Sequence, residues 1–538
     1  MGWSKARLEQ VARERLAGAK LIVVANREPY IHRRRDGAVE WIRPAGGLTT
    51  ALDPVMRACG GVWVAHGSGT ADRETADAFG RVRVPPNDPR YVLRRVWLSG
   101  EEESGYYYGF ANSTLWPLCH HVYQRPTFEP ADWAHYRAVN ERFAAAVLEE
   151  AAGGPALVFV QDYHFALLPR LLKRARPDLA LAQFWHIPWP NAETFRVCPW
   201  ADEILDGLLG NDLLGFQVQY HCNNFLETVD RTVEARVCRE HFAVCHRGHQ
   251  TRVRPFPISV DPDLASDYLA AGDGWEARAA SFRRRYGLGD RPIVLGVDRV
   301  DYTKGIPERF WAVERLLNTR PDWAGRFHFV QLGVPSRTHL QPYRDLNGDV
   351  QDLADWINQK HGTESWRPVV IVNEHCAPPD IYALYRMAAG CVVSSLHDGM
   401  NLVAKEFIAA RADEQGVLVL SRFTGAAREL TEAVLVNPFD VGGLADGLHD
   451  VLSQPAEEQR RRMRKLRARI MDNNIYRWAG MLLSEAHKLT DYGGWAADEP
   501  GAAGRSLSPG PSSAPVLDGA PDPGVMSADG AAVLKFTA

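Results

Sequence analysis

Short apolar runs alternate with longer amphipathic stretches along most of this chain. The runs are three to six residues long and are bounded by polar or turn-forming residues. Continuous apolar runs of this length, with helical patterns between them, are typical of buried strands in parallel sheets built from βαβ units. The predicted strands are residues 21–25, 157–160, 181–185 and 214–217 in the first half, and 293–297, 327–332, 369–372, 391–393 and 417–420 in the second half.

The predicted strands form two sets, one ending near Pro255-Phe256-Pro257 and the other starting near Arg291-Pro292. Each set predicts a Rossmann-like α/β domain, and two such domains are expected to face each other across a cleft. Residues 495–538 are rich in Gly, Ala, Pro and Ser, which predicts a disordered tail. The expected limits are 19–257 for the N-terminal domain, 258–474 for the C-terminal domain, and 475–494 for a last helix that packs back on the N-terminal domain.

The composition is that of an ordinary globular protein, with 46% hydrophobic and 24% charged residues among 538. The net charge of -4 gives no electrostatic argument for a nucleic acid or an acidic membrane as partner. No run approaches the roughly eighteen apolar residues of a membrane span. The first twenty residues also lack the apolar region of a signal peptide. We therefore expect a soluble cytoplasmic protein.

One cluster of metal-ligand residue types stands out among the eight cysteines and eighteen histidines. Zinc-like spacings have many false positives, so an exposed polar surface on a helix and a following loop is the favoured interpretation. Metal binding stays open at this cluster, which comprises Cys238, His241, Cys245, His246 and His249.

The segment 394–407 carries the most chemical information. It follows a predicted strand, contains an Asp398-Gly399 turn, and continues into a helical pattern that begins at Leu402. A strand, a tight turn and a helix place unpaired backbone N–H groups at a helix N-terminus, which is a ready anion site. Asp398 and Glu406 bracket that site. From the residues alone, the two carboxylates fit either a nucleotide-sugar site or the acid and nucleophile of a glycoside hydrolase.

Two cations follow the strand at 293–297 on a single loop. Arg299 and Lys304 are suited to the charge of a pyrophosphate leaving group. The alternative is a structural ion pair, because such pairs also occur away from active sites. Asp301 is expected to orient one of the two cations.

Further residues that could donate hydrogen bonds to a phosphate lie in two other loops. Arg27 follows the first strand and Arg337 follows the strand at 327–332, and each offers a forked guanidinium group. Gly46 and Gly47 would permit close backbone approach to a ligand, although a plain turn explains such a pair equally well.

Candidate sugar contacts come from four more residues. Asp162 and His186 directly follow predicted strands, where open parallel sheets bind their ligands, but a helix cap and a structural histidine are the alternatives. Tyr107 and Trp116 could stack on a sugar or pack into the core.

These segments together resemble the trehalose-6-phosphate synthase family, the family 20 of retaining glycosyltransferases, which has two Rossmann-like domains in the GT-B arrangement. The resemblance covers residues from about 20 to about 490. Trp189 departs from it, because phenylalanine is more usual there, and this change is expected to reshape the acceptor pocket. The matching motifs are Asn-Arg at 26–27, Gly-Gly-Leu at 46–48, Asp-Tyr-His at 162–164, His-Ile-Pro at 186–188, Arg-x-Asp-Tyr-x-Lys-Gly at 299–305 and Asp-Gly-Met-Asn-Leu-Val-x-Lys-Glu at 398–406.

The resemblance implies a role for each matching position. Donor-binding residues would be Gly46, Gly47, Arg299, Lys304, Asp398, Asn401, Leu402, Val403 and Glu406. Within that set Asp398 would hold the glucose, the Leu402 and Val403 backbone the diphosphate, and Glu406 the ribose. Acceptor-binding residues would be Arg27, Tyr107, Trp116, Asp162 and Arg337, and catalytic residues Asp162, His186, Arg299, Lys304 and Asp398.

The implied reaction is glucose transfer with retention from UDP-glucose or GDP-glucose to glucose 6-phosphate, which gives trehalose 6-phosphate. The family implies front-face attack, with no metal or other cofactor, so neither carboxylate attacks carbon. Two alternatives remain: the same chemistry on another phosphorylated acceptor (glycerol phosphate or a cyclitol phosphate), and a non-catalytic sugar-phosphate sensor. The nucleotide base and the oligomeric state stay open, and a homo-oligomer is compatible with the chain.

Overall fold

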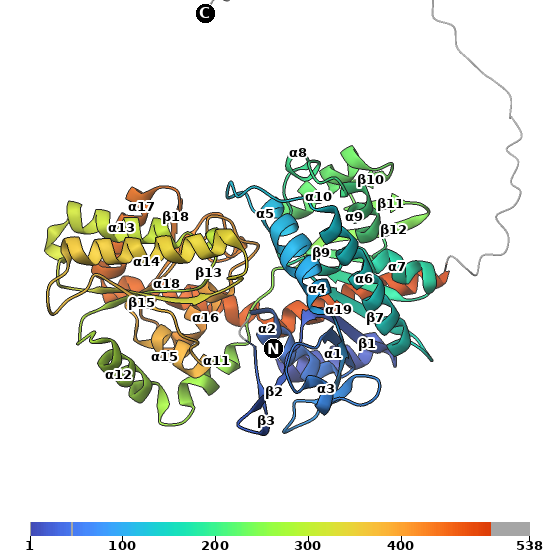
Figure 1. Cartoon of the computed structure of the whole chain (residues 1–538), viewed down its shortest axis with the longest axis horizontal. Coiled ribbons are helices and arrows are strands. Elements are labelled where there is room, and N and C mark those ends of the chain that lie inside the picture. Colours follow the sequence, from blue (N-terminus) through green and yellow to red (C-terminus); the bar gives the residue numbers. More distant parts are fainter. Residues whose placement is uncertain (1, 45–46, 496–538) are drawn as a thin grey trace, which may run out of the picture. The chain divides into compact units, whose positions relative to one another are not determined.

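The structure is a computed structural model that describes residues 2–44 and 47–495 (Figure 1). Gly46 lies outside the described residues, and so does the predicted disordered tail from residue 496 onward. Residue 495, which the sequence analysis places in the tail, ends the last helix, α19 (Ile475–Trp495).

The first sheet is parallel through its centre and antiparallel at both edges. Its central strands are buried on both faces, which explains why they are continuous apolar runs in the sequence. In spatial order the strands are β10 (Arg236–Cys238), β11 (Ala243–His246), β12 (His249–Pro255), β9 (Leu213–Phe216), β8 (Ala180–Phe184), β7 (Ala156–Gln161), β1 (Lys20–Arg27), β4 (Val62–His66), β6 (Tyr91–Val96) and β5 (Arg81–Val84).

Helices cover both faces of this sheet, because side chains alternate between faces along each strand. In β1, Ile22 and Val24 pack into one apolar cluster, whereas Leu21 and Val23 pack into another. A hairpin of β2 (Ile31–Arg35) and β3 (Ala38–Ile42) follows β1. The helices of this half are α1 (Lys5–Leu16), α2 (Gly47–Cys59), α3 (Asp72–Thr75), α4 (Gly100–Glu103), the π-helix η1 (Ser104–Leu115), α5 (Trp116–Cys119), α6 (Pro130–Glu150), η2 (Tyr163–Phe165), α7 (Leu168–Ala175), α8 (Ala192–Phe195), α9 (Ala201–Leu208) and α10 (Gln219–Thr232).

The second sheet is parallel throughout. Its strands, in spatial order, are β15 (Val369–Val372), β14 (His328–Pro335), β13 (Ile293–Val300), β16 (Gly390–Val393), β17 (Val417–Ser421) and β18 (Val434–Val436). Its helices are α11 (Pro262–Ala270), α12 (Gly274–Tyr286), η3 (Tyr302–Lys304), α13 (Ile306–Thr319), η4 (Pro321–Trp323), α14 (Gln341–His361), α15 (Pro378–Met387), α16 (Leu402–Ala410), η5 (Gly425–Arg428), α17 (Val441–Ser453) and α18 (Ala456–Asp472).

This second sheet also has helices on both faces, with α13 and α14 on one side and α15 on the other (Figure 1). All nine predicted apolar runs are strands, as β1, β7, β8, β9 and β13 to β17. The α/β fold class with two Rossmann-like sheets is therefore confirmed. The limits proposed between domains stay predictions.

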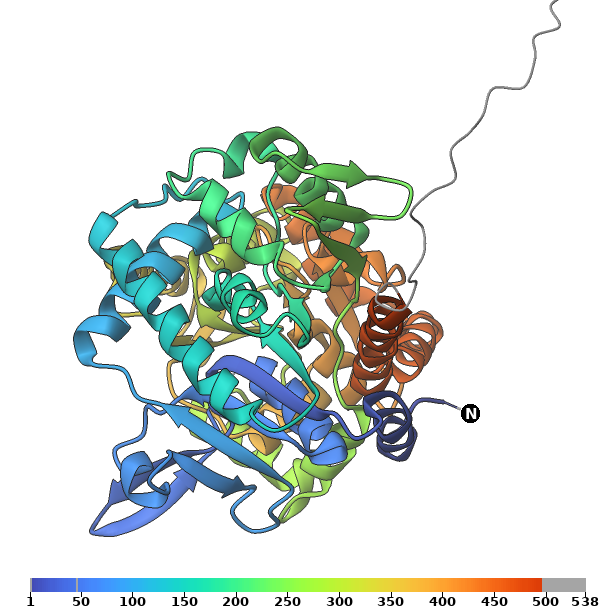
Figure 2. The same ribbon diagram turned by 90° about the vertical axis from the view of Figure 1, so that its right-hand side faces the viewer.

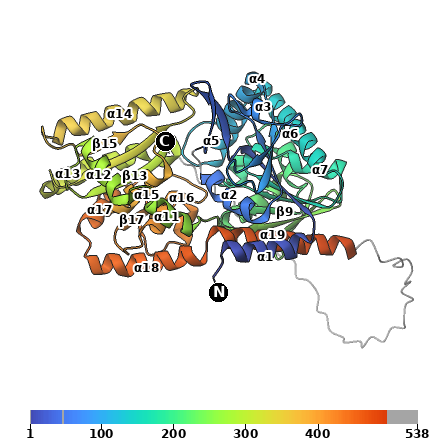
Figure 3. The ribbon, with the colours of Figure 1, turned by 90° about the horizontal axis from the view of Figure 1, so that it is seen from below.

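The last helix returns to the first half of the chain. Trp478 of α19 contacts the rings of Phe159 in β7 and Phe184 in β8. The side-chain amide of Asn474, just before α19, donates to the Trp3 carbonyl, 2.8 Å away, beside α1. Two views show the first and last helices side by side (Figures 2 and 3).

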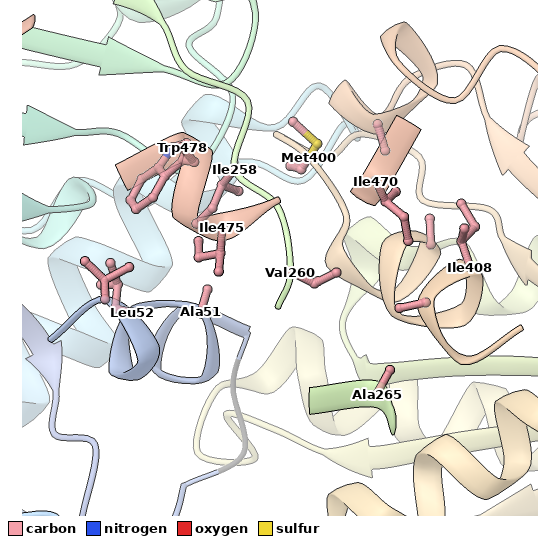
Figure 4. Packing of buried hydrophobic residues seen from close by; sticks show 14 of the residues in the cluster. Ala51, Leu52, Ile258, Val260, Ala265, Met400, Ile408, Ile470, Ile475 and Trp478 are labelled. Atoms are coloured by element: carbon pink, nitrogen blue, oxygen red, sulfur yellow. The ribbon is translucent and has the colours of Figure 1, made fainter. Parts of the chain in front are cut away.

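The residues that connect the two sheets lie within an apolar cluster rather than in an exposed linker. Residues 256–261 join β12 to α11. Ile258 and Val260 are buried, and the cluster around them includes Ile475 and Trp478 of α19 as well as Met400 (Figure 4). One continuous core therefore passes from the first sheet to the second through this connection.

The prediction for the Cys238 to His249 segment was wrong about its structure. Four of these residues are in the antiparallel strands β10, β11 and β12, and His241 is in the turn between β10 and β11, so the segment is not a helix followed by a loop. His246 Nε2 lies 3.0 Å from an oxygen of Asp206, and His249 Nε2 lies 2.9 Å from the Asn211 carbonyl. Within residues 2–44 and 47–495, no cluster of three such side chains is arranged to hold a metal ion. The same described part of the chain contains no helix both long and apolar enough to cross a membrane.

Candidate active site

Tyr107 is held on a helix whose turns are wider than those of an α-helix. The π-helix η1 places it opposite the end of β1, where Arg27 Nη2 donates to the Tyr107 hydroxyl at 3.2 Å. The Asn112 amide and the Ser113 hydroxyl donate to carbonyls five residues earlier, which supports the wide turns. Extended π-helices are rare and occur at functional sites.

The charge around Tyr107 is strongly positive. Burial by itself raises the pKa of this phenol, but three guanidinium groups outweigh burial and bring the pKa down to about 7. The same positive charge, together with burial, lowers the pKa of one of these groups, Arg299. The three groups are Arg27, Arg337 and Arg299. A cluster of this charge is suited to a phosphate dianion.

Arg337 joins the two halves of the site. Its guanidinium carbon lies 4.2 Å from the ring centre of Trp116 in α5, which is a cation–π contact between the two halves of the chain. Its Nη1 donates to Asp301 Oδ2 at 3.0 Å and also to the Tyr343 hydroxyl. The hydrogen-bonded cation of the Asp301 carboxylate is thus Arg337, while Asp301 holds Lys304 only through the backbone, since it caps η3 by accepting from the Thr303 N–H at 3.0 Å.

Lys304 instead pairs with the turn after β16. Its ammonium group donates to Asp398 Oδ2 at 2.6 Å. The same oxygen accepts from Ser395 Oγ at 3.3 Å and from the Asn401 amide at 3.2 Å. Burial raises the pKa of Asp398, but Lys304 and the other donors more than offset it and lower that pKa to about 2. Asp398 is therefore an ionised carboxylate with three hydrogen bonds to one of its oxygens.

The helix that follows this turn begins as the sequence predicts. Asn401 caps α16 by accepting from the Ala404 N–H at 3.1 Å, and Leu402 and Val403 are the first two helical residues. Their N–H groups are the ones that an α-helix leaves without an intrahelical partner. Further along, Glu406 accepts from the Tyr385 hydroxyl at 3.1 Å, and burial raises its pKa to about 7.

Asp162 and His186 form a second polar pair on the first sheet. The His186 N–H donates to Asp162 Oδ1 at 3.1 Å, and His186 Nε2 lies 2.9 Å from Gln161 Oε1. Asp162 does not cap η2 with its side chain. Burial raises the pKa of Asp162 to about 7 and lowers that of His186 to about 3. His186 is thus neutral at physiological pH.

Three of the predicted site residues have left-handed backbone conformations. The φ angles are 69° at Asp162, 50° at Arg337 and 86° at Asn401. Such conformations are unfavourable for residues other than glycine and persist where the surrounding structure holds them, often at functional sites. Their occurrence at three predicted positions supports a shared site.

The two halves touch directly at the site. A Cβ atom on Gly399 would lie 2.1 Å from the His186 carbonyl oxygen, so only glycine allows the Asp398 turn to lie against that loop. The neighbouring His397 accepts from the His121 N–H at 3.1 Å. The structure therefore brings the predicted donor and acceptor residues together.

Gly46, Gly47 and Trp189 are the predicted residues that the contacts above do not include. Gly47 is the first residue of α2, and Gly46 is outside the described part of the chain. Trp189, which the sequence analysis expects to reshape the acceptor pocket, is fully buried in the core and donates to Thr228 Oγ1 at 3.0 Å. The expected reshaping of the acceptor pocket stays a prediction, and any such effect would be transmitted from the core.

Arg309 was missed by sequence reasoning although it bonds to the segments that carry Lys304 and Asp398. This fully buried arginine donates to Asp298 at 2.7 Å, to the Lys304 carbonyl at 3.0 Å and to Ser394 Oγ at 2.8 Å. A signal exists in the sequence, since Arg309 lies on the apolar face of α13 with Ile306. A charged residue at such a position needs a buried partner.

Comparison with known proteins gives one consistent result. Residues 19–488 match the family model described as Glycosyltransferase family 20. A trehalose-6-phosphate synthase of Mycobacterium tuberculosis (strain H37Rv) is 41% identical over 479 residues, which are 87% of this chain and 95% of the relative. The corresponding protein of Mycobacterium avium is 41% identical over 476 residues, 86% of this chain and 94% of its own length.

Solved structures agree with these relatives. A structure from E. coli bound with UDP-2-fluoro glucose has a TM-score of 0.78 at 29% identity, covering 87% of this chain and 99% of that one. An alpha,alpha-trehalose-phosphate synthase (UDP-forming) from Burkholderia xenovorans in complex with glucose-6-phosphate has a TM-score of 0.77 at 28% identity, covering 87% and 100%.

Proposed function

This chain belongs to glycosyltransferase family 20, and we propose that it transfers glucose with retention from a nucleotide-glucose to glucose 6-phosphate, giving trehalose 6-phosphate. The trehalose-6-phosphate synthase activity follows from the similarity to curated synthases along 87% of the chain. The observation that carries the proposal within the site is the cluster of three guanidinium groups around Tyr107, close to the Lys304–Asp398 pair at the start of α16.

The donor is proposed to bind along the turn and first residues of α16. The Leu402 and Val403 N–H groups would hold the diphosphate, since a helix N-terminus attracts anions. Glu406 would hold a ribose hydroxyl, and its pKa of about 7 lets it donate or accept that hydrogen bond. Asp398, ionised and held by Lys304, would accept hydrogen bonds from hydroxyl groups of the transferred glucose. Gly46 and Gly47 would approach the donor phosphates.

Transition-state stabilisation is proposed to come from Arg299 and Lys304. As the bond to glucose breaks, negative charge accumulates on the departing diphosphate, and fixed cations stabilise that charge more than the ground state. Lys304 is already positioned by Asp398, so little reorganisation is required.

The acceptor is proposed to bind through its phosphate and its ring. Arg27, Tyr107 and Arg337 would hold the phosphate, and Trp116 would line the pocket beneath Arg337. Asp162 and His186 would contact sugar hydroxyls. Retention follows if the acceptor hydroxyl attacks the face that the diphosphate leaves and passes its proton to a departing phosphate oxygen.

The substrates are small molecules, as in the related structures bound with UDP-2-fluoro glucose and with glucose-6-phosphate. Those ligands support UDP-glucose as donor, while GDP-glucose is the alternative that the experiment must separate. A donor-by-acceptor matrix tests the proposal: purified protein is incubated with each nucleotide-glucose and each phosphorylated acceptor, and released nucleoside diphosphate is measured.

Release with glucose 6-phosphate, and a product with retained configuration by NMR, is the expected outcome. Faster release with glycerol phosphate or a cyclitol phosphate would show that this compound, and not glucose 6-phosphate, is the preferred acceptor. Binding of both substrates without any release would instead identify a sensor.

A further inference from the structure

One residue of the connection between the two sheets, Ile258, is hydrogen-bonded to both halves of the chain. Its N–H donates to Gln217 Oε1 at 3.1 Å. Its carbonyl accepts from Lys405 Nζ at 2.7 Å. Gln217 follows β9 of the first sheet, whereas Lys405 is in α16 of the second half. The backbone of a single residue in the connection is therefore bonded to side chains of both halves, through the two peptide groups that flank its Cα.

Lys405 is unusual for its position in α16. It is fully buried, whereas its inward-facing neighbours Ala404, Phe407 and Ile408 are apolar. A buried ammonium group is unfavourable unless it is paired, and an apolar residue would pack here without that penalty. Its carboxylate partner is Glu429, at 2.6 Å. Lys405 also directly precedes Glu406, the proposed ribose ligand, and it has no role in the reaction proposed above.

Gln217 continues the chain of hydrogen bonds into the acceptor side. Its side chain is almost completely buried, and its Nε2 donates to the His186 carbonyl at 3.3 Å. The His186 N–H in turn donates to Asp162. The close approach of Gly399 to the same carbonyl brings the donor turn to this point as well. One amide thus bonds both to the connection and to the loop that carries His186.

The rest of the connection is hydrogen-bonded to α19. Trp478 Nε1 donates to the Phe256 carbonyl at 3.1 Å, and the Ile475 N–H donates to the Val260 carbonyl at 3.1 Å. Figure 4 shows Ile475 and Trp478 beside Ile258, with Val260 between them and the second half. The connection is consequently packed and hydrogen-bonded, so a change in the position of α16 can be transmitted through it.

We infer that Lys405 and Gln217 are positioning residues that couple nucleotide binding at α16 to acceptor binding at the His186 loop, through the backbone of Ile258. This inference rests on the proposed function, because it takes α16 as the nucleotide site and the His186 loop as part of the acceptor site. Spatial continuity alone does not establish coupling, so the test measures coupling directly.

Calorimetry on the full chain provides that test, with UDP and glucose 6-phosphate as probes. In the wild-type protein, saturation with UDP is expected to tighten glucose 6-phosphate binding by about fivefold or more, a usual size for coupling between sites. Lys405→Met and Gln217→Met remove the hydrogen bonds at nearly constant volume. Each is expected to reduce the coupling to within about twofold of none, while the affinity for each ligand alone changes by less than about threefold.

Lys173→Met is the matched control. Lys173 Nζ also bonds to a carbonyl, that of Leu179 at 2.6 Å, and to a carboxylate, that of Asp212 at 3.0 Å. This variant loses the same pair of interactions, at a partly buried lysine, without touching Ile258, so its coupling should equal the wild-type value. An equal loss of coupling in Lys173→Met would assign the effect to general destabilisation and overturn the inference.

The double variant sharpens the result. If both side chains act through the backbone of this one residue, Lys405→Met/Gln217→Met loses no more coupling than either single variant. Additive losses, retained coupling in both single variants, or an uncoupled wild-type protein would each refute the inference. If Lys405→Met does not fold, Gln217→Met decides alone. Failure of the wild-type protein to bind either probe would count against the proposed function, and so the two failures are distinguishable.

Discussion

The proposed donor wall of the site, formed by Lys304, Asp398 and Glu406, and the proposed acceptor wall around Tyr107 balance their charges in different ways. On the donor wall, Lys304 pairs with Asp398, and Glu406 has a pKa near neutrality, so the charges largely cancel. On the proposed acceptor wall, the guanidinium groups of Arg27 and Arg337 face Tyr107 together with Arg299, the proposed ligand of the departing diphosphate, and Asp301 is bonded to Arg337. Like charges in close proximity repel, and a bound anion relieves that repulsion. The charges of the proposed donor wall are thus largely balanced without substrate, whereas we expect a bound phosphate to balance the excess positive charge of the proposed acceptor wall.

Removing a cation that faces the departing diphosphate should have the largest effect. Arg299→Ala and Lys304→Ala are each expected to reduce turnover by about a hundredfold or more, as for other lost electrostatic donors. Release of nucleoside diphosphate at saturating substrates measures this, and thermal unfolding checks that each variant is folded. Near-normal turnover in both variants would refute the assigned roles.

Arg27→Ala should separate the walls. Arg27 is exposed at the end of β1, so its loss should leave the donor wall intact. A hydrogen bond to a charged group contributes about 1.5–3 kcal/mol, so the KM for glucose 6-phosphate should rise about tenfold to a hundredfold. The KM for the nucleotide-glucose should stay the same. Unphosphorylated glucose is the control acceptor, because it should be used equally poorly by both proteins.

The pH dependence of acceptor binding should sharpen the comparison further. The phenol of Tyr107 has a pKa of about 7 in the unliganded site, so the phenolate becomes dominant above that pH. A phenolate repels a phosphate dianion, and therefore binding of glucose 6-phosphate should weaken by up to about tenfold per pH unit between pH 7 and 9. Calorimetry over this range should show a flat profile for Tyr107→Phe. An equal slope in both proteins would contradict the role of Tyr107.

Trp189→Phe should have the smallest effect on catalysis. Trp189 packs behind the acceptor wall, where its indole donates to Thr228. The substitution should lower stability by about 1–3 kcal/mol through a cavity and a lost hydrogen bond. The KM for glucose 6-phosphate should stay within about twofold of wild type, as steady-state kinetics can measure. A larger change would support the expectation that this residue shapes the pocket.

The comparison between the walls shows how far sequence reasoning reached. Buried strands and the helix at Leu402 were predictable because their apolar periodicity is local. The strand β4, with the buried residues Val62–His66, was missed although its pattern is also apolar. The π-helix that carries Tyr107 was not predictable from periodicity, since its wide turns depend on packing and on side-chain bonds from Asn112 and Ser113.

Choice of partner was the step that local patterns could not supply. Asp301 lies three residues before Lys304 but bonds to Arg337, and Lys304 bonds to Asp398, 94 positions away. Arg309 was overlooked because its four hydrogen-bond partners come from β13, β14, η3 and the residue after β16, which are far apart in the chain. Electrostatic pairing depends on distance in space, and sequence separation gives no measure of that distance.

The amino-acid sequence by itself determined the α/β class, the two sets of strands and the motif residues, because short-range periodicity and residue chemistry carry that information. Only the tertiary structure decided which charges neutralise one another, which side chains face Tyr107, and how Gln217 and Lys405 hold Ile258 from opposite sides. Those outcomes depend on strands and helices far apart in the chain packing within a few ångströms of each other, where burial strengthens each interaction and makes each unpaired group unfavourable.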